Sequence, residues 1–135
     1  MPARAFFDTN VLVYALAKND ARKPRAQELV SVGGILSLQV LNEFTSVARK
    51  KLMLSWAEIR EAIDAFVVLC PAPLPITLEL HEAAREIAGK HGYGIYDGLV
   101  IAAALEAGCS ILYSEDLQDR QGIDSQLTIR NPFTA

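Results

Sequence analysis

Four acidic residues stand where they could do chemistry together: Asp8, Glu43, Asp97 and Asp116. Asp8 directly follows a short apolar run, and Asp116 lies just beyond another. In a parallel sheet both would project from the carboxyl ends of strands, where open α/β sheets bind ligands. Asp97 heads an apolar helical stripe, and Glu43 lies at the edge of a second stripe. The pattern predicts that these side chains meet in one site.

Carboxylates gathered in one site favour metal binding, because they would repel one another unless a cation lay between them. Mg²⁺ and Mn²⁺ are hard ions that prefer oxygen ligands, and either one or two such ions fit this donor set. Neither histidine of the chain, His81 or His91, falls within the segments that carry the acids. A metal-free nuclease that uses imidazole as general acid and base is therefore disfavoured.

Each acid also has a purely structural explanation. Asp8, or either of the two residues after it, could cap a helix. Asp97 would complement the dipole at the start of its helix. Glu43 could be a solvated flank residue, and Asp116 could belong to a polar turn. Taken singly these explanations are at least as good as a site; the combination of all four acids favours the site.

The elements that would position the acids follow from hydrophobic periodicity. Strands are predicted at Ala5–Phe7, Gly34–Leu38, Phe66–Cys70, Ser110–Tyr113 and Leu127–Ile129. Helices are predicted at Val11–Ala17, Pro24–Val32, Gln39–Lys51, Ser55–Phe66, Thr77–Lys90 and Ile95–Ala107. Such alternation is typical of an α/β protein with a mostly parallel sheet, here of five strands.

The order of the strands in the sheet decides whether the acids meet. If the chain crosses the sheet between its first three and its last two strands, Ala5–Phe7 and Ser110–Tyr113 become neighbours at the switch point. Asp8 and Asp116 would then lie together. The proline-rich segment Cys70–Pro75 (CPAPLP) is predicted to be a rigid connector, because proline cannot continue a ladder or a helix interior.

Length and composition narrow the class of protein. The 135 residues, 51% of them hydrophobic, predict one domain over residues 1–135. No run suits a signal peptide or a bilayer span, so we expect a soluble, cytoplasmic protein with no membrane partner. Cys70 and Cys109 have no metal-binding spacing and are predicted to be core residues. The net charge of −3 argues against a uniformly basic nucleic-acid binder but leaves RNA open.

Four motifs together resemble the PIN-domain family, and in particular the VapC toxins of bacterial type II toxin–antitoxin pairs. They are FFDTNVLVYAL at Phe6–Leu16, LNEF at Leu41–Phe44, IYDGLVIAAALEAGC at Ile95–Cys109 and LYSEDLQDRQGIDSQLTIRNPF at Leu112–Phe133. The resemblance runs nearly end to end. It implies a three-layer α/β/α fold.

The resemblance also implies roles for individual residues. The family's four acids fall on Asp8, Glu43, Asp97 and Asp116, which would hold the metal and carry catalysis. Asn10 matches the polar residue that supports the first acid, and Ser114 supplies the hydroxyl two residues before the fourth.

Two features depart from the family pattern. Gly98 stands where the family often has alanine, which we interpret as a minor cost in helix propensity. Glu115 and Asp119 crowd the fourth acid, and either could share the role that we assign to Asp116.

The implied function is hydrolysis of RNA phosphodiester bonds by an endoribonuclease that requires Mg²⁺ or Mn²⁺. The implied partners are RNA, a cognate antitoxin and a second copy of the chain in a homodimer. Candidate RNA contacts, which could equally be solvated helix faces, are Arg49, Lys50 and Lys51, and also Arg22, Lys23 and Arg25.

Three other functions are weaker. A receiver-like signalling module needs a phosphoacceptor after a middle strand, where this chain has CPAPLP. A catalytically inactive PIN-like binding module would tolerate loss of acids, yet all four are present. A phosphatase of the haloacid dehalogenase type needs a second aspartate two residues after Asp8, where Asn10 stands.

Overall fold

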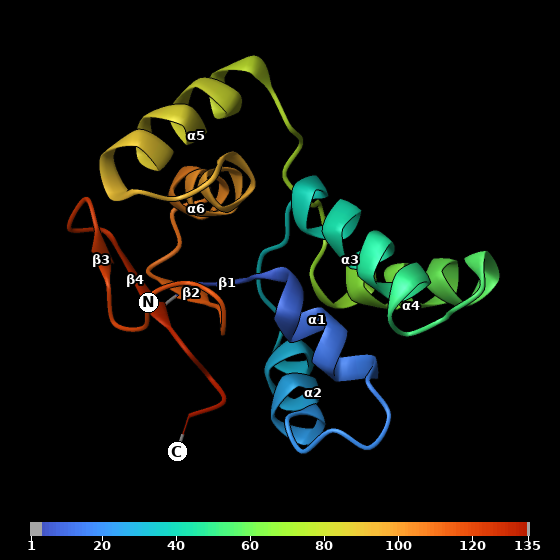
Figure 1. The fold of residues 1–135 in the computed structure, drawn as a ribbon. Coiled ribbons are helices and arrows are strands. Elements are labelled where there is room, and N and C mark those ends of the chain that lie inside the picture. The colour runs from blue at the N-terminus through green and yellow to red at the C-terminus, as the bar shows by residue number, and fades with distance from the viewer. Residues whose placement is uncertain (1–3, 135) are drawn as a thin grey trace.

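Ten elements follow one another in the part of the chain that the structure describes, residues 4–134 of a computed structural model (Figure 1). The strands are β1 (Ala5–Phe7), β2 (Ile111–Tyr113), β3 (Gly122–Ile123) and β4 (Leu127–Arg130). The helices are α1 (Thr9–Leu16), α2 (Lys23–Val32), α3 (Leu38–Lys50), α4 (Trp56–Leu69), α5 (Leu78–His91) and α6 (Ile95–Glu106). All six predicted helices are present, and the α/β class is confirmed.

The sheet has the strand order β1-β2-β4-β3. β1 and β4 each pair with β2 in parallel, and only β3 runs antiparallel to its neighbour β4. Phe6, Leu112 and Ile129 lie side by side in the parallel register and are fully buried. Strands Ala5–Phe7 and Ile111–Tyr113 are therefore neighbours, as the crossing of the chain predicted.

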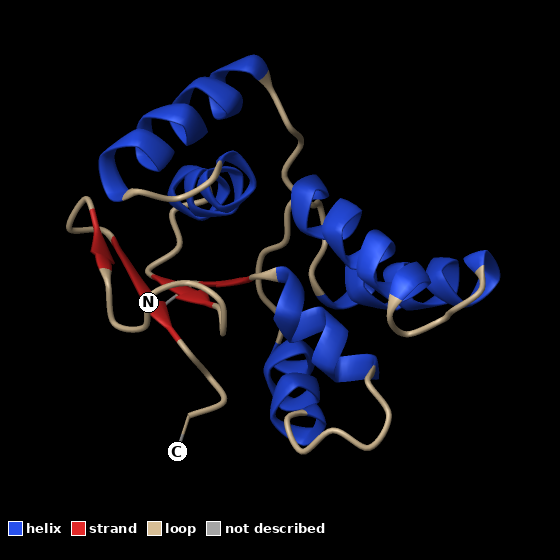
Figure 2. Cartoon of the chain, viewed as in Figure 1, coloured by secondary structure: helices blue, strands red, loops and turns tan. Residues whose placement is uncertain are grey.

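The helices form two groups around this sheet. α5 and α6 pack against each other on one side, whereas α1 to α4 gather beyond β1 (Figure 1), as the blue helices of Figure 2 also show. The buried apolar residues form one continuous cluster, in which Phe44 of α3 meets Phe66 of α4 edge to face at 5.2 Å between ring centroids. Both Cys70 and Cys109 are buried in it, as predicted. None of the helices described between residues 4 and 134 is long and apolar enough to cross a bilayer.

The predicted strand Phe66–Cys70 is wrong. These residues continue α4, which ends at Leu69, and Cys70 forms its C-cap. A short apolar run cannot by itself distinguish a strand from a buried helix segment. Here the capping box of Ser55 and Glu58 starts a helix whose apolar positions Ile59 and Phe66 stay on the buried face.

The sheet edge beyond β1 also differs from the prediction. Gly34–Leu38 forms no named strand, and only Ile35 and Ser37 make isolated parallel bridges, to Phe6 and Leu74. Ser37 instead caps α3, which begins at Leu38. Leu74, within the predicted connector, pairs like a strand residue through its own backbone. The described sheet has four strands, not five, because β3 was not predicted and two predicted strands do not form.

Gly98 has a packing role that its helix propensity conceals. A methyl group at this position would lie 2.5 Å from the backbone oxygen of Ala84, because α5 crosses α6 closely there. Gly89 in α5, by contrast, has no atom within 4 Å of the same position. The interpretation of Gly98 as a minor helix cost is thus incomplete, since only glycine fits without a backbone shift.

We predict that Gly98→Ala destabilises the protein. The gain in helix propensity is about 1 kcal/mol, whereas overpacking against a backbone atom costs about 1–3 kcal/mol. Gly89→Ala, the matched control, has the same propensity gain without the clash and should raise the melting temperature. Thermal melts of the two variants measure both signs, and a Gly98→Ala protein as stable as Gly89→Ala would contradict the packing role.

Candidate active site

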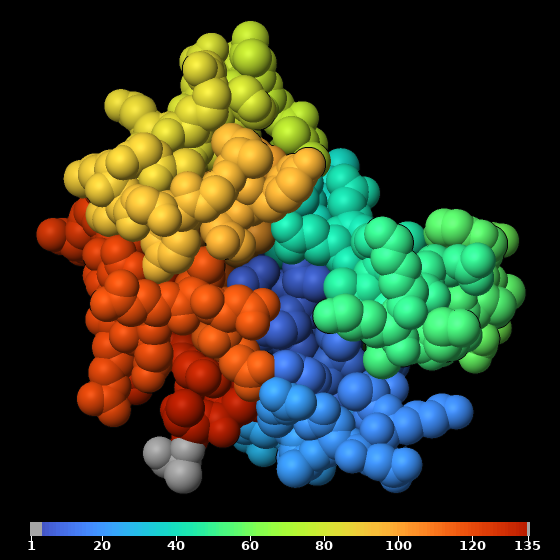
Figure 3. Space-filling model, in the orientation of Figure 1, coloured from blue at the N-terminus to red at the C-terminus, as the bar shows by residue number. Residues whose placement is uncertain are grey.

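All four predicted acids line one cavity of about 470 Å³. Asp8 stands between β1 and α1, Glu43 on α3, Asp97 on α6, and Asp116 in the turn after β2. Figure 3 shows these parts of the chain meeting, with blue α1 between the green α3–α4 pair and the orange C-terminal segment. The other lining residues are Thr9, Asn10, Val13, Tyr14, Ser46, Val47 and Lys51.

Asp8 is the most buried of the acids, with an exposed fraction of 5%. Its position follows from the sheet, because the Asp8 backbone N–H donates to the Tyr113 carbonyl at 3.0 Å and so extends the pairing of β1 with β2. Its carboxylate accepts hydrogen bonds from the Thr9 backbone N–H and the Ser114 hydroxyl, both at 2.7 Å. Asp8 is also the N-cap of α1, as its structural explanation predicted.

Burial raises the pKa of Asp8 from 3.8 to about 7. The carboxylates of Glu43 and Asp116 add to the increase, and the hydrogen bonds from Ser114 and Thr9 oppose it. Burial likewise raises the pKa of Asp97, again with Glu43 and Asp116 contributing. The acids therefore lie near enough to one another for their negative charges to interact.

Separate donors hold the remaining two acids. The Thr9 hydroxyl donates to Glu43 at 2.6 Å, and the Gln39 amide, one turn earlier on α3, donates to the other carboxylate oxygen at 3.2 Å. The Asn10 amide donates to Asp116 at 3.3 Å. The roles of Thr9 and Gln39 were not predicted; the spacing of Gln39 and Glu43 by four helical residues was the available signal.

The turn after β2 is organised around the buried Ser114. Its hydroxyl accepts the backbone N–H groups of Asp116 and Leu117, both at 3.2 Å, while it donates to Asp8. The Asn10 side chain completes the turn by accepting the Glu115 backbone N–H at 3.1 Å. Asn10 and Ser114 thus join the first acid to the fourth.

The four carboxylates offer hard oxygen ligands on one cavity, which suits a divalent cation. Among residues 4–134, however, no three Asp, Glu, His or Cys side chains stand close enough to ligate one ion as they lie. Asp8, Glu43 and Asp116 instead accept hydrogen bonds from neighbouring protein groups. The side chains that share the cavity would have to turn toward a common point to bind a cation.

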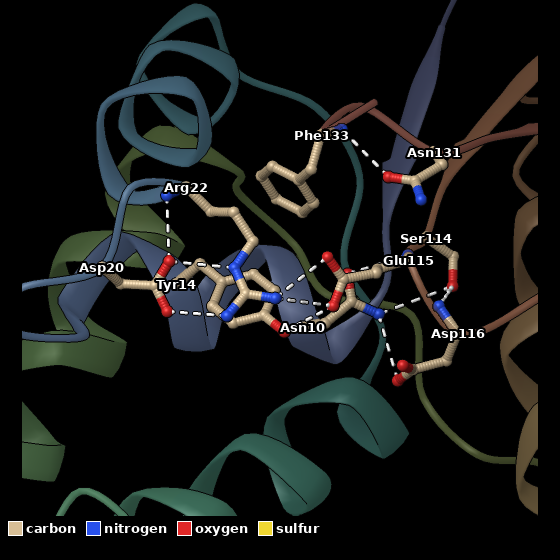
Figure 4. Close-up of polar contacts among 9 residues, drawn as sticks. All are labelled: Asn10, Tyr14, Asp20, Arg22, Ser114, Glu115, Asp116, Asn131 and Phe133. Carbon is tan, nitrogen blue, oxygen red and sulfur yellow. Dashed lines mark hydrogen bonds and ion pairs between the residues drawn. The ribbon is translucent and has the colours of Figure 1, made fainter. Parts of the chain in front are cut away.

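Glu115 does not line this cavity, and Figure 4 shows its carboxylate directed toward Arg22 and Tyr14. Arg22 pairs with Glu115 at 3.1 Å and with Asp20 at 2.8 Å, and its guanidinium lies 3.8 Å from the centroid of the Tyr14 ring. The Tyr14 hydroxyl donates to the same Glu115 carboxylate. Burial, together with that bond, raises the pKa of Tyr14 to about 12.

The contacts of Glu115 and Asp119 distinguish both from Asp116. Glu115 is held by Arg22 and Tyr14, and Asp119 accepts the Asn131 backbone N–H at 2.8 Å. Neither residue lines the cavity, whereas Asp116 does.

The candidate RNA contacts differ in where they lie relative to the cavity of the acids. Lys51 lines the cavity of the acids, and Arg49 and Lys50 line a neighbouring groove. Arg22 belongs to the Glu115 cluster, Lys23 begins α2, and Arg25 pairs with Glu28 at 2.8 Å.

Comparison with known proteins identifies a family and several structures of the same fold. The family model of the PIN domain matches residues 5–121. The sarcin–ricin loop cleaving toxin VapC20 of Mycobacterium tuberculosis is similar in structure, with a TM-score of 0.63 and 23% identity over 83% of this chain and 89% of that one. A comparison with curated protein sequences found no match.

Two further structures share the fold over nearly all of both chains. One is a toxin–antitoxin complex from Klebsiella pneumoniae, with a TM-score of 0.71 and 19% identity over 97% of this chain and 99% of that one. The other is VapBC2 of Rickettsia felis bound to a fragment of promoter DNA, with a TM-score of 0.66 and 19% identity over 94% and 97% of the two chains.

The raised pKa of Asp8 predicts that the metal-free protein loses stability as pH rises. The unfolded chain releases this proton near pH 3.8, whereas the folded protein keeps it up to about pH 7. Between these values the unfolded state binds fewer protons, so the free energy of unfolding falls with rising pH. Thermal melts in EDTA at pH 5 and pH 8 should show the loss.

Asp8→Asn is the control, because its side chain has no proton to release in this range. Its melting temperature should fall less between the two pH values, and it should exceed that of the parent at pH 8. Equal pH responses in parent and variant would contradict a buried Asp8 that titrates near neutrality.

Proposed function

The chain belongs to the PIN-domain family, and we propose that it is an endoribonuclease dependent on Mg²⁺ or Mn²⁺. The observation that carries the proposal is the presence of four carboxylates from separate parts of the chain on one cavity. Burial raises the pKa of Asp97, and the negative charges of Glu43 and Asp116 add to the increase; a cation among the acids would relieve that repulsion. An inactive module kept only for binding has no need of this costly arrangement.

Asp8, Glu43, Asp97 and Asp116 are the residues that would hold the metal. A bound divalent ion lowers the pKa of a water and neutralises negative charge on the phosphorus oxygens. The supporting residues Asn10 and Ser114 keep Asp8 and Asp116 in register with each other. Lys51, which lines the same cavity, would bind an RNA phosphate that the acids alone would repel.

We further propose that the protein is the toxin of a toxin–antitoxin pair. The solved structures with this fold include a toxin that cleaves the sarcin–ricin loop and two complexes of toxin–antitoxin pairs. Because the fold matches over nearly the whole chain, we extend their biology to this protein: a toxin in the cytoplasm, restrained by a cognate antitoxin and assembled as a homodimer.

Asp97→Asn tests the proposed activity most sharply. Asp97 lies in the first turn of α6, whose N-cap is Gly94, so asparagine removes the charge, keeps nearly the same shape and costs at most about 0.3–1 kcal/mol of helix-dipole stabilisation. Cleavage of RNA in Mg²⁺ should fall by at least about 100-fold, as for loss of one electrostatic group in other active sites. In EDTA the variant should melt no lower than the parent, because one repelling charge is gone.

The matched control is Asp119→Asn, which removes an acid that lies outside the cavity. It should cleave like the parent. The parent should cleave no RNA in EDTA. In Mg²⁺ its products should carry 5′-phosphate and 3′-hydroxyl ends, because a water molecule attacks the phosphorus. A folded Asp97→Asn protein with parental activity, or products with cyclic phosphate ends, would refute the proposal.

A further inference from the structure

A second groove adjoins the cavity of the acids on α3. Its volume is about 490 Å³, and its lining residues are Asn42, Thr45, Ser46, Arg49, Lys50 and Trp56. Ser46 lines both this groove and the acid cavity, so the two are continuous across one residue. Nothing in the proposed hydrolysis itself uses this groove.

Helix geometry explains why the two hollows lie side by side. Glu43, Ser46 and Val47 are spaced three and four residues apart and face the acid cavity. Asn42, Thr45 and Arg49, one residue off that stripe, face the second groove. Arg49 lies six positions after Glu43, which corresponds to about 9 Å along the helix axis. A nucleotide near the scissile phosphate could span this distance.

Trp56 is the residue in the groove that lacks a folding explanation. It is the single tryptophan of the chain, it begins α4, and 63% of it is exposed. Large aromatic side chains normally bury most of their area. The cap of α4 does not need it, because Ser55 and Glu58 supply the hydrogen bonds.

Arg49 of α3 lies over the tryptophan ring. Its guanidinium carbon lies 4.9 Å from the centroid of the indole ring, and the same group donates to the Leu54 carbonyl at 3.1 Å. The groove therefore offers a positioned aromatic ring beside a positioned cation. Lys50 adds a second positive charge.

We propose that the Trp56 groove binds one unpaired nucleotide of the RNA substrate, with its base stacked on the indole and its phosphate near Arg49 and Lys50. Aromatic rings and guanidinium planes are the surfaces on which proteins stack the splayed bases of single-stranded RNA. The inference rests on the proposed ribonuclease activity and deepens it, because it makes the substrate a single strand or a loop. The positive groove also offsets the repulsion of phosphates by the four nearby acids.

The fluorescence of Trp56 tests the proposal directly, because no other tryptophan contributes. The probe is a short single-stranded oligoadenylate, in EDTA so that it is not cleaved. Saturable quenching by this strand, and none by an abasic ribose-phosphate strand of equal length, is the expected result. Emission that depends on protein concentration but not on RNA would instead assign Trp56 to a contact between copies of the chain.

Substitutions separate stacking from charge. Trp56→Ala should weaken binding of labelled oligoadenylate by about 5- to 150-fold, whereas Trp56→Phe should retain most of the affinity. Arg49→Ala should weaken the oligoadenylate and the abasic strand alike. Val68→Ala, which removes an exposed apolar side chain elsewhere on α4, is the matched control and should bind like the parent.

The outcomes also separate this inference from the proposed function. A Trp56→Ala protein that binds and cleaves RNA like the parent would overturn the nucleotide groove and leave the ribonuclease intact. A parent that cleaves no RNA in Mg²⁺ would overturn the ribonuclease, whatever its affinity for oligoadenylate.

Discussion

The parallel pairing of β1 with β2 is the constraint on which the site depends. Hydrogen bonds continue past the last strand residues, from the Asp8 N–H to Tyr113 and from the Ser114 N–H to Arg130. Asp8 and Ser114 are therefore neighbours because the strands are, and the turn that carries Asp116 starts from the same point. This pairing is what brings Asp8 next to Ser114 and Asp116, which lie more than a hundred positions away in the sequence.

The buried and clustered carboxylates lower the stability of the folded protein. Burial of Asp8 and the mutual repulsion of the acids oppose ionisation, as the raised pKa values of Asp8 and Asp97 indicate. The chain limits this cost with neutral donors, since Ser114, Thr9 and Asn10 each give a hydrogen bond to one carboxylate. The nearby cation Arg22 pairs with Glu115 and Asp20 and not with the four acids, and Lys51 is the cation that lines the cavity within the described residues 4–134. Because the four acids are not paired with basic side chains in this part of the chain, they are suited to binding a metal cation from solution.

Some of this arrangement could be predicted from the sequence, and the reasons are local. Asp8 and Asp116 come just after strands, and a parallel sheet brings the carboxyl ends of neighbouring strands together. Asp97 could be identified because it is an acid at the start of an apolar helix. The end of α4 could not be predicted, because a short apolar run fits a strand or a buried helix equally well, and the packing of Phe66 on Phe44 joins residues from two helices. The close approach of Ala84 to Gly98, and the capture of Glu115 by Arg22, likewise depend on tertiary packing that no sequence spacing reveals.

We propose that these four acids bind one metal site, which anomalous X-ray scattering from crystals grown with Mn²⁺ above pH 7 would locate. At this pH Asp8 is ionised, since its pKa lies at about 7. We expect an anomalous peak in the cavity, in contact with carboxylate oxygens of Asp8 and Asp97 and of at least one of Glu43 and Asp116. A saturated crystal with no peak in that cavity would contradict it.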